Sequence, residues 1–301
     1  MMESVIKFII GFSNLDERNA FPIAVREGLE QAASQYPDIQ LIVRNNDLNT
    51  DLAKQHIREF ADVPVDLAMI FHVDERAGFN MIQPLHRKNI PIISIEMPYP
   101  LTYFFGVDNV DMGQQAGHVV GNWIRSNWNG YVDKVLIATA SGVIGEIPGR
   151  FEAALNALTG YVPVSRDQIL YLDSEMERAV IQSRVVPVLE QWKEYQHIVV
   201  ICINDYVASG ILAAARQVGR EQDIAVLSYD GTPVAFEEFA RPFSRLLVSP
   251  AFYPEKYGGY LIDLALKILH GEKVPRQNFI KAQCLTRENY QDHLPERTSD
   301  D

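Results

Sequence analysis

The sequence predicts an α/β protein made of two similar domains, each with a doubly wound parallel sheet. Short apolar runs typical of strands alternate with amphipathic helical segments almost throughout, and this alternation occurs in two successive series. A chain of 301 residues is also long for a single core and comfortable for two. Alternating strands and helices form parallel sheets with helices on both faces.

Four aliphatic or β-branched runs are the predicted strands of the first series: Val5–Ser13, Ile39–Asp47, Val65–Val73 and Ile90–Glu96. Each run is short and bounded by turn residues, as expected for a strand. The segments between them space apolar residues three and four apart, which predicts helices over Phe21–Tyr36, Asn49–Ala61 and Ala77–Asn89. We expect Asn49 or Thr50 to cap the second of these helices.

The second series repeats this order. Its predicted strands are Asp133–Thr139, Gln168–Asp173, His197–Ile203 and Asp223–Asp230. Its predicted helices are Pro148–Leu158, Glu177–Trp192 and Asp205–Gly219, and Pro187 is expected to kink or shorten the second. A helix over Asn109–Trp128 bridges the two series. The remaining predicted elements are a short helix after Asp230, a strand at Ser244–Ser249, a helix from about Pro254 to His270 and a last strand near Ile280–Cys284.

The composition argues against several kinds of partner. Lys and Arg number 27 against 39 Asp and Glu, and no basic block stands out, so nucleic acid is not expected as a partner. The two cysteines, Cys202 and Cys284, have neither the count nor the spacing of a metal site, and no cofactor is predicted. A disulfide between them stays open. No apolar run approaches the roughly 18 residues of a membrane helix.

The first residues, MMESVIKFIIGFS, enter a predicted strand almost at once. They lack the charged segment, apolar core and cleavage site of a signal peptide. We therefore expect either a cytosolic protein or one from which a signal peptide has been removed, and the residues alone leave both open.

Polar and aromatic side chains follow the predicted strands at their carboxyl ends, where ligands bind in open α/β sheets. The candidates are Asn19, Phe21 and Glu96-Met97 in the first series, and Arg150, Asp173–Met176, Asn204 and Asp230 in the second. Amides and carboxylates bind hydroxyl groups, and rings cover the apolar faces of sugars or bases. The set therefore predicts a hydroxylated small molecule as the ligand.

Each candidate also has a structural alternative. The alternatives are a core residue for Phe21, a solvated helix residue for Arg150, a turn residue for Glu96, a helix cap for Asp230 and a locally satisfied side chain for His72. Asn204 and Asp205 both suit a helix cap, and we expect Asp205 to cap the following helix while Asn204 faces the ligand. The convergence of the set at strand ends, rather than any one residue, supports the site.

Catalytic motifs are absent from the sequence. It has no G-x-S-x-G, no H-E-x-x-H and no phosphate loop ending in Gly-Lys-Ser/Thr. The glycine-rich stretch Gly142–Gly149 between a strand and a helix could cradle a phosphate, but no acidic ribose partner is evident at the next strand end. We expect a protein that is not an enzyme.

Six segments of the chain together resemble a known family. They are NAFPIAVREGLEQAA, IPIISIE, FFGVDNVDMGQQAG, VVICINDYVASGILAAA, IAVLSYDGTP and YPEKYGGYLIDLALKILHGEKVP. In combination they resemble the periplasmic binding protein type I family, in particular its sugar-binding, ribose-binding-protein-like branch. That branch shares its fold with the effector domains of lactose-repressor-type regulators. The resemblance runs from Val5 to about Tyr290.

The resemblance implies two discontinuous lobes, residues 1–105 with 253–279 and residues 106–252 with 280–301, joined by a three-crossover hinge. The crossovers fall near Phe104–Gly106, Val248–Phe252 and Phe279–Lys281. The family clamps its ligand in the cleft between the lobes by hinge closure, and the closed form is delivered to a membrane permease or a receptor. The resemblance thus implies a periplasmic protein whose signal peptide is absent from this sequence, and a monomer fits a closing clamp.

Four candidates match ligand-binding positions of the family. Asn19 and Phe21 stand where the first-loop asparagine and a stacking aromatic residue stand. Asn204 and Asp230 match the asparagine of its Asn-Asp pair and the aspartate of its Asp-Gly pair. The resemblance implies that these residues bind sugar hydroxyls from opposite lobes.

The other candidates lie where the chain departs from the family's pattern. The departures are Pro22 for a second aromatic residue, Glu96-Met97 for Asp-Arg, Met176 for an aromatic residue and Phe252 for the glutamine at the second crossover. Arg150 matches the ligand-binding arginine only approximately, and the first loop is longer than usual. A plain aldopentose is therefore not supported as the ligand.

Three hypotheses about function follow. The first is a periplasmic solute-binding protein of an ABC-type transporter that binds a sugar or sugar-like molecule. The alternative is the ligand-sensing domain of a transcriptional regulator or receptor, and the third is an α/β enzyme acting on a nucleotide or sugar. The acidic residues Glu96, Asp230 and Glu146 leave room for an amine-bearing or cationic ligand.

Overall fold

The computed structural model describes residues 6–74, 77–140 and 147–294. The chain divides into two compact units. Unit 1 comprises Met1–Val107 and Tyr253–Lys281, and unit 2 comprises Asp108–Phe252 and Ala282–Asp301. The chain therefore passes from one unit to the other three times. The lobe bounds given above stay a prediction.

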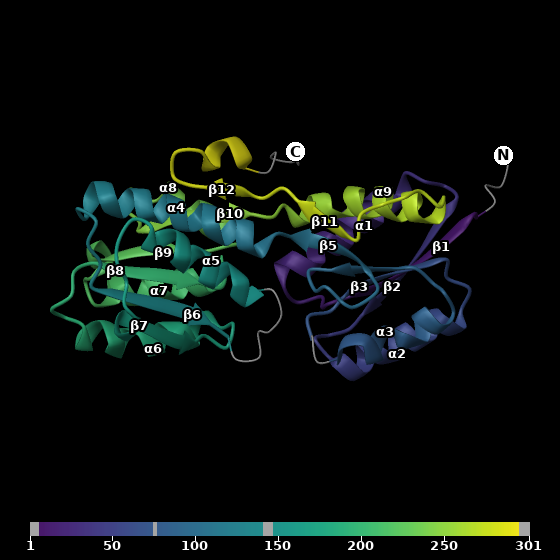
Figure 1. Cartoon of the computed structure of the whole chain (residues 1–301), viewed down its shortest axis with the longest axis horizontal. Helices are drawn as coiled ribbons and strands as arrows, with labels where there is room; N and C mark the ends of the chain where they lie inside the picture. The colour runs from purple at the N-terminus through teal and green to yellow at the C-terminus, as the bar shows by residue number, and fades with distance from the viewer. Residues whose placement is uncertain (1–5, 75–76, 141–146, 295–301) are drawn as a thin grey trace, which may run out of the picture. The chain divides into compact units, whose positions relative to one another are not determined.

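Unit 1 contains a six-stranded sheet in the order β11-β5-β4-β3-β1-β2, in which all neighbouring strands are parallel. The strands are β1 (Phe8–Asn14), β2 (Ile39–Asn45), β3 (Leu67–Phe71), β4 (Ile92–Ile95), β5 (Tyr103–Val107) and β11 (Gln277–Ile280). The helices are α1 (Ala20–Ser34), α2 (Thr50–Asp62), α3 (Gly78–Arg87) and α9 (Tyr257–Leu269). In Figure 1, α1 packs beside α9 on one face of this sheet, and α2 packs beside α3 on the other.

Unit 2 contains a second six-stranded sheet in the order β12-β10-β9-β8-β6-β7 (Figure 1). The strands are β6 (Lys134–Thr139), β7 (Ile169–Asp173), β8 (Ile198–Cys202), β9 (Ile224–Leu227), β10 (Leu246–Ala251) and β12 (Gln283–Leu285). The helices are α4 (Asn109–Asn127), α5 (Ile147–Thr159), α6 (Arg178–Gln191), α7 (Asp205–Gln217) and α8 (Pro233–Ala240). Short 3-10 turns are η2 (Arg166–Gln168), η3 (Glu221–Asp223) and, in unit 1, η4 (Pro254–Lys256), with η5 (Tyr290–His293) in unit 2.

The central strands explain why the strand prediction succeeds. Every residue of β3 and β8 is buried, and both strands consist only of apolar residues or cysteine. Such continuous apolar runs are typical of parallel strands that helices cover on both faces. The two-domain α/β fold class and the eight strands of the two series are thus confirmed, and Asn49 caps α2 by accepting hydrogen bonds from the amides of Asp51 and Leu52.

Four details differ from the prediction. The run Tyr103–Val107 forms β5, which was not predicted because it is a short aromatic run directly before the first passage between units. The single last strand predicted near Ile280–Cys284 is two strands, β11 and β12, one in each sheet. Strand β12 pairs antiparallel with β10, so the second sheet is not wholly parallel. Helix α6 continues past Pro187 to Gln191, so this proline does not shorten the helix, and a kink there stays a prediction.

Glycines allow two close helix contacts in unit 1. A Cβ atom at Gly28 of α1 would lie 2.5 Å from the carbonyl oxygen of Glu255, and one at Gly258 of α9 would lie 2.0 Å from that of Gly28. These distances are far below van der Waals contact, so the backbones of α1 and the start of α9 meet only because neither glycine has a side chain. The next residue, Gly259, is exposed and meets nothing within 4 Å.

The two adjacent glycines of α9 make a matched pair for mutation. Gly258→Ala should lower the free energy of unfolding by about 1–3 kcal/mol, because the added methyl group overpacks the contact with α1. Gly259→Ala should be neutral or stabilise the protein by up to about 1 kcal/mol, because alanine is the better helix former. Urea unfolding of both variants tests this, and equal effects would contradict the packing argument.

Candidate functional site

The carboxyl ends of parallel strands meet at one edge of each sheet, so residues that follow neighbouring strands come close together. In unit 1 this edge carries the residues after β1, β3 and β4. In unit 2 it carries the residues after β6, β8, β9 and β10. The candidates of each unit form a separate group.

In unit 1 an aromatic group joins Phe21 to Glu96. The Phe21 ring at the start of α1 lies edge-on to Phe71 at 6.2 Å and to Tyr257 at 5.6 Å between ring centroids. The fully buried Tyr257 donates a hydrogen bond from its hydroxyl to the Glu96 carboxylate at 2.5 Å. Phe21 and Glu96 therefore share one partner, which the sequence prediction missed.

The backbone at Glu96 is unusual. Its φ of +60° lies in the left-handed region, which a residue with a side chain adopts at a cost on the order of 1–3 kcal/mol. The Glu96 amide donates to the carbonyl oxygen of Phe105 at 2.9 Å, which holds the turn against β5. A Cβ atom at Gly106 would lie 3.1 Å from the Glu96 carboxylate, so this glycine leaves room for it. Backbone strain of this kind is concentrated at functional sites.

The structure places Asn19 and Met97 outside this aromatic group. Asn19 is exposed, and its side-chain amide donates to the Asp16 carboxylate at 2.9 Å rather than capping α1. The Asp16 carboxylate also accepts the amides of Arg18 and Asn19, which fixes the loop after β1. Met97 is 1% exposed and packs in the core of unit 1 with Tyr99.

A second polar group in unit 1 was missed by the sequence analysis. The Asn46 carboxamide oxygen accepts from the Ser13 hydroxyl at 2.7 Å and lies 2.9 Å from His56 Nδ1. His72 Nε2 lies 3.1 Å from the Thr50 hydroxyl. One ring nitrogen of His72 thus has a local hydrogen-bond partner, in line with the structural alternative for this residue.

In unit 1 two buried side-chain atoms lack hydrogen-bond partners among the described residues. They are Oδ1 of Asn14 and Nδ1 of His72, whose side chains are 0% and 2% exposed. Asn14 ends β1 and His72 follows β3, and these two strands are neighbours in the sheet. Unsatisfied buried polar atoms are costly. Asn14 and His72 are therefore added to the candidate site.

In unit 2 the Arg150 side chain gathers several candidates. It is 5% exposed, so the solvated alternative for this residue is wrong. Its guanidinium carbon lies 4.7 Å from the ring centroid of Tyr229 and 5.3 Å from that of Phe252. Its Nε donates to the Asn109 carboxamide at 2.7 Å, and an Nη donates to the carbonyl oxygen of Ile203 at 3.4 Å. Arg150 and Phe252 thus meet beside the end of β8.

The capping role expected of Asp205 belongs to Asn204. Asn204 caps α7, since its carboxamide oxygen accepts the amide of Val207 at 2.9 Å. Asp205 is buried and accepts the Ser249 hydroxyl at 2.6 Å, the Thr232 amide at 2.8 Å, the Thr232 hydroxyl at 2.9 Å and the Ser228 hydroxyl. These partners come from β10, from the start of α8 and from the end of β9, so Asp205 ties strand ends together instead of capping its own helix.

Asp230 joins the same edge through its backbone. Its φ of +105° is again unusual for a residue with a side chain. Its amide donates to the carbonyl oxygen of Pro250 at 3.0 Å, and its own carbonyl accepts the amide of Phe252 at 3.3 Å. Met176 lies before α6 with its side chain 44% exposed, and the described contacts do not connect it with Arg150.

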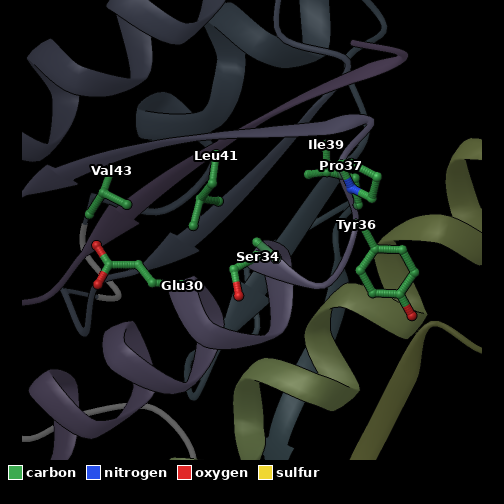
Figure 2. A pocket seen from close by; sticks show the side chains of 8 residues that line it. Glu30, Ser34, Tyr36, Pro37, Ile39, Leu41 and Val43 are labelled. Carbon is green, nitrogen blue, oxygen red and sulfur yellow. The ribbon is translucent and has the colours of Figure 1, made fainter. Parts of the chain in front are cut away.

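A shallow groove of about 360 Å³ lies elsewhere in unit 1, between the end of α1 and β2 (Figure 2). Its lining residues include Glu30, Ser34, Tyr36 and Leu41, and none of them is a candidate. Strand β2 is at the edge of its sheet, so this groove is a feature of the sheet edge rather than of the strand ends.

Both cysteines are free thiols, so they are not bonded to each other. The part of the chain that the structure describes contains no group of three or more His, Cys, Asp or Glu side chains placed to hold a metal ion. Within the same residues, no helix is both long and apolar enough to span a lipid bilayer. Most of the glycine-rich stretch Gly142–Gly149, with Glu146, lies outside the described residues.

A comparison with family models matches residues 10–273 to the periplasmic binding protein domain. The chain belongs to this family. The resemblance and fold class expected from the sequence are confirmed. A search of curated protein sequences gave no match.

Several solved structures of periplasmic binding proteins have the same fold. An ABC transporter solute-binding protein from Actinobacillus succinogenes with bound D-allose is 21% identical, with a TM-score of 0.80 over 95% of this chain and 100% of that chain. One from Bacillus halodurans with bound myo-inositol is 19% identical, with a TM-score of 0.79 over 97% and 99%. The fructose-binding periplasmic domain of a hybrid two-component system is 18% identical, with a TM-score of 0.73 over 95% and 93%.

The buried histidines of this binding protein predict a pH dependence of stability. Burial lowers the pKa of His72 below its ordinary value of 6.5, and it does the same for His56. Below pH 6.5 the unfolded chain therefore binds protons at these histidines more readily than the folded protein does. The free energy of unfolding falls as the pH falls. One histidine contributes up to about 1.4 kcal/mol per pH unit.

We expect His72→Gln to flatten the pH profile of the unfolding free energy between pH 7 and 5. Urea unfolding at four pH values measures the slope, and His118→Gln, which removes an exposed histidine, serves as the control. A His72→Gln slope equal to that of the wild type would show that this ring does not titrate differently on folding.

The buried carboxylate of Asp205 makes a second prediction. Asp205→Ala leaves four donors without an acceptor and should lower the unfolding free energy by on the order of 3 kcal/mol. Asp205→Asn keeps one carbonyl acceptor and should lose roughly half as much. Glu237→Gln, at an exposed site on α8, is the control. If Asp205→Ala unfolded at the wild-type urea concentration, the assigned hydrogen bonds would not stabilise the fold.

Proposed function

We propose that the chain is the periplasmic solute-binding protein of an ABC-type transporter and binds a sugar or sugar-like molecule. The observation that carries the proposal is the Arg150 group, in which a buried guanidinium lies against two aromatic rings beside Asn204 and Asp230. Family membership and the sugar- and polyol-bound relatives add support. The partners in this proposal are a small ligand and a membrane permease, and the protein acts as a monomer.

The candidate residues have the chemistry that a polyhydroxylated ligand needs. Asn204 offers an amide, Glu96 and Asp230 offer carboxylates, and Arg150 offers guanidinium donors. Aromatic rings such as those of Phe21 and Phe252 cover the apolar C–H faces of a sugar. We propose that contacts of this kind hold one ligand, and the resemblance implies hinge closure around it.

The same residues favour a neutral ligand over a cationic one. The Glu96 carboxylate already accepts the Tyr257 hydroxyl, which offsets part of its attraction for a cation. Arg150 adds a buried positive charge in unit 2 that would repel an amine-bearing ligand. We therefore propose a neutral sugar or polyol as the ligand.

A ligand-sensing receptor is the second candidate. The fructose-binding periplasmic domain of a two-component system shares this fold, so the same binding site suits a sensor as well as a transporter. Binding of the sugar-loaded protein to a purified permease complex would support the transporter, and its binding to a sensor kinase would support the receptor. No catalysis is part of either proposal, and recovery of the bound sugar unchanged after long incubation tests this point against the enzyme hypothesis.

A thermal-shift screen against D-allose, myo-inositol, D-fructose and D-glucosamine tests the proposal. A ligand that binds only the folded protein raises the melting temperature in proportion to RT ln(1 + [L]/Kd). We expect a neutral sugar or polyol to give the largest shift. A shift from D-glucosamine alone would overturn the neutral-ligand assignment, and a shift from none of the four would count against this ligand class.

Two variants then test the site by calorimetric titration. Asn204→Ser keeps a capping oxygen for α7 but removes the amide, and Asp230→Asn keeps a residue that tolerates positive φ but removes the charge. Each should weaken binding by roughly 5- to 150-fold, which corresponds to about 1–3 kcal/mol for a lost buried hydrogen bond. Glu237→Gln should bind as the wild type does. Wild-type affinity in both site variants would show that the site lies elsewhere.

A further inference from the structure

The side chain of Arg150 is held by residues at two of the three points where the chain passes between the units. Asn109 lies two residues after Val107, the last residue of the first stretch of unit 1. Phe252 is the last residue before the chain returns to unit 1 at Tyr253. Asn109 accepts the Arg150 Nε–H at 2.7 Å, and the Phe252 ring lies 5.3 Å from the guanidinium. Arg150 therefore contacts one residue next to each of these two passages.

The Asn109 amide is not needed to start its own helix. Asp108 caps α4, since its carboxylate accepts the amides of Val110 at 3.1 Å and Asp111 at 2.9 Å. Asn109 is nevertheless 2% exposed, and its carboxamide oxygen is directed to Arg150. Its Nδ2 is buried and has no hydrogen-bond partner among the described residues. Burying an unpartnered amide nitrogen costs free energy, and the Asn109 side chain does not cap its helix. Its burial therefore indicates a role through Arg150.

Arg150 itself is a buried cation without a carboxylate partner in the described part of the chain. Its contacts are the carboxamide of Asn109, the carbonyl oxygen of Ile203 and two ring faces, all of them neutral. A guanidinium has five N–H donors, and these hydrogen bonds use two of them. Neutral acceptors hold the orientation of Arg150 while leaving donors for another oxygen.

We propose that Asn109 is a positioning residue that orients Arg150 for the ligand and connects this arginine to the first passage between the units. The inference rests on the proposed function, because the further acceptor for Arg150 is an oxygen of the proposed sugar. It adds a residue that touches the arginine and not the ligand.

The test compares two substitutions of similar size. Asn109→Leu removes the acceptor for Arg150 Nε–H, whereas Asn109→Asp keeps an oxygen at the same place. We expect Asn109→Leu to weaken binding of the strongest sugar or polyol of the screen by about 10-fold or more, and Asn109→Asp to restore it to within about threefold. Asn122→Leu is the matched control, because Asn122 is an exposed asparagine of the same helix that accepts from another arginine, Arg125.

A readout without ligand separates this inference from the proposed function. In ¹⁵N NMR spectra the Arg150 Nε–H resonance should be protected from hydrogen exchange in the wild type and in Asn109→Asp, and exchange rapidly in Asn109→Leu. Arg150→Lys assigns the resonance by its loss. Protection that survives in Asn109→Leu would overturn the positioning role, whether or not a sugar binds. Equal loss of affinity in the Leu and Asp variants would overturn it too.

Discussion

The candidate site of unit 2 depends on one buried carboxylate, that of Asp205. Its hydrogen bonds reach Ser228 at the end of β9, Thr232 at the start of α8 and a serine of β10. Asn204 precedes it in sequence, and Asp230 lies between Ser228 and Thr232, so these bonds fix the backbone on which both candidates stand. Burial raises the pKa of Asp205, and its hydrogen bonds oppose that shift. A buried carboxylate is tolerated only with such partners.

Unit 1 holds its strand ends by a different device. The rings of Phe21 and Phe105 lie edge-on to the Tyr257 ring, at 5.6 and 5.1 Å between centroids, and Phe71 lies edge-on to Phe21. The Tyr257 hydroxyl then fixes a carboxylate on a strained backbone at Glu96. Edge-to-face ring contacts contribute on the order of 1 kcal/mol each beyond the buried area. The two sheets have equivalent strand orders apart from the antiparallel β12. Aromatic packing orients the candidates in one unit, and a hydrogen-bonded carboxylate orients them in the other.

Local pattern predicts the strands and their polar ends, because burial between two helix layers requires continuous apolar runs. It therefore finds Phe21, Asn204 and Asp230 as residues placed after strands. It does not find Tyr257, which is 161 residues away from Glu96 along the chain, or Asn109, which is 41 residues away from Arg150. No local pattern encodes contacts over such separations. A local pattern also does not show which of two adjacent residues, both able to cap a helix, is the cap.

Asn204 and Asp205 illustrate that last limit. Both side chains can accept the amide of a helix start, so capping propensity alone does not distinguish them. The choice is made by Ser228 and Thr232, which lie more than twenty residues further along the chain and offer Asp205 several donors at once. A carboxylate has more acceptor positions than a carboxamide oxygen. Asp205 can therefore accept all of these donors, whereas Asn204 accepts the single amide of the helix start.

Two arginines of unit 2 differ in whether a carboxylate pairs with their charge. Arg216 contacts the carboxylates of Glu221 and Glu238, and these neighbours raise its pKa further above the ordinary value. Its charge is consumed inside the fold, so it is a structural residue. Arg150 is more deeply buried than Arg216 and has only neutral partners among the described residues. Fold stability alone would favour a carboxylate beside it, because an unpaired buried charge is costly. The cost makes sense where the donors are kept for a ligand, and it places Arg150 at the centre of the candidate site of unit 2.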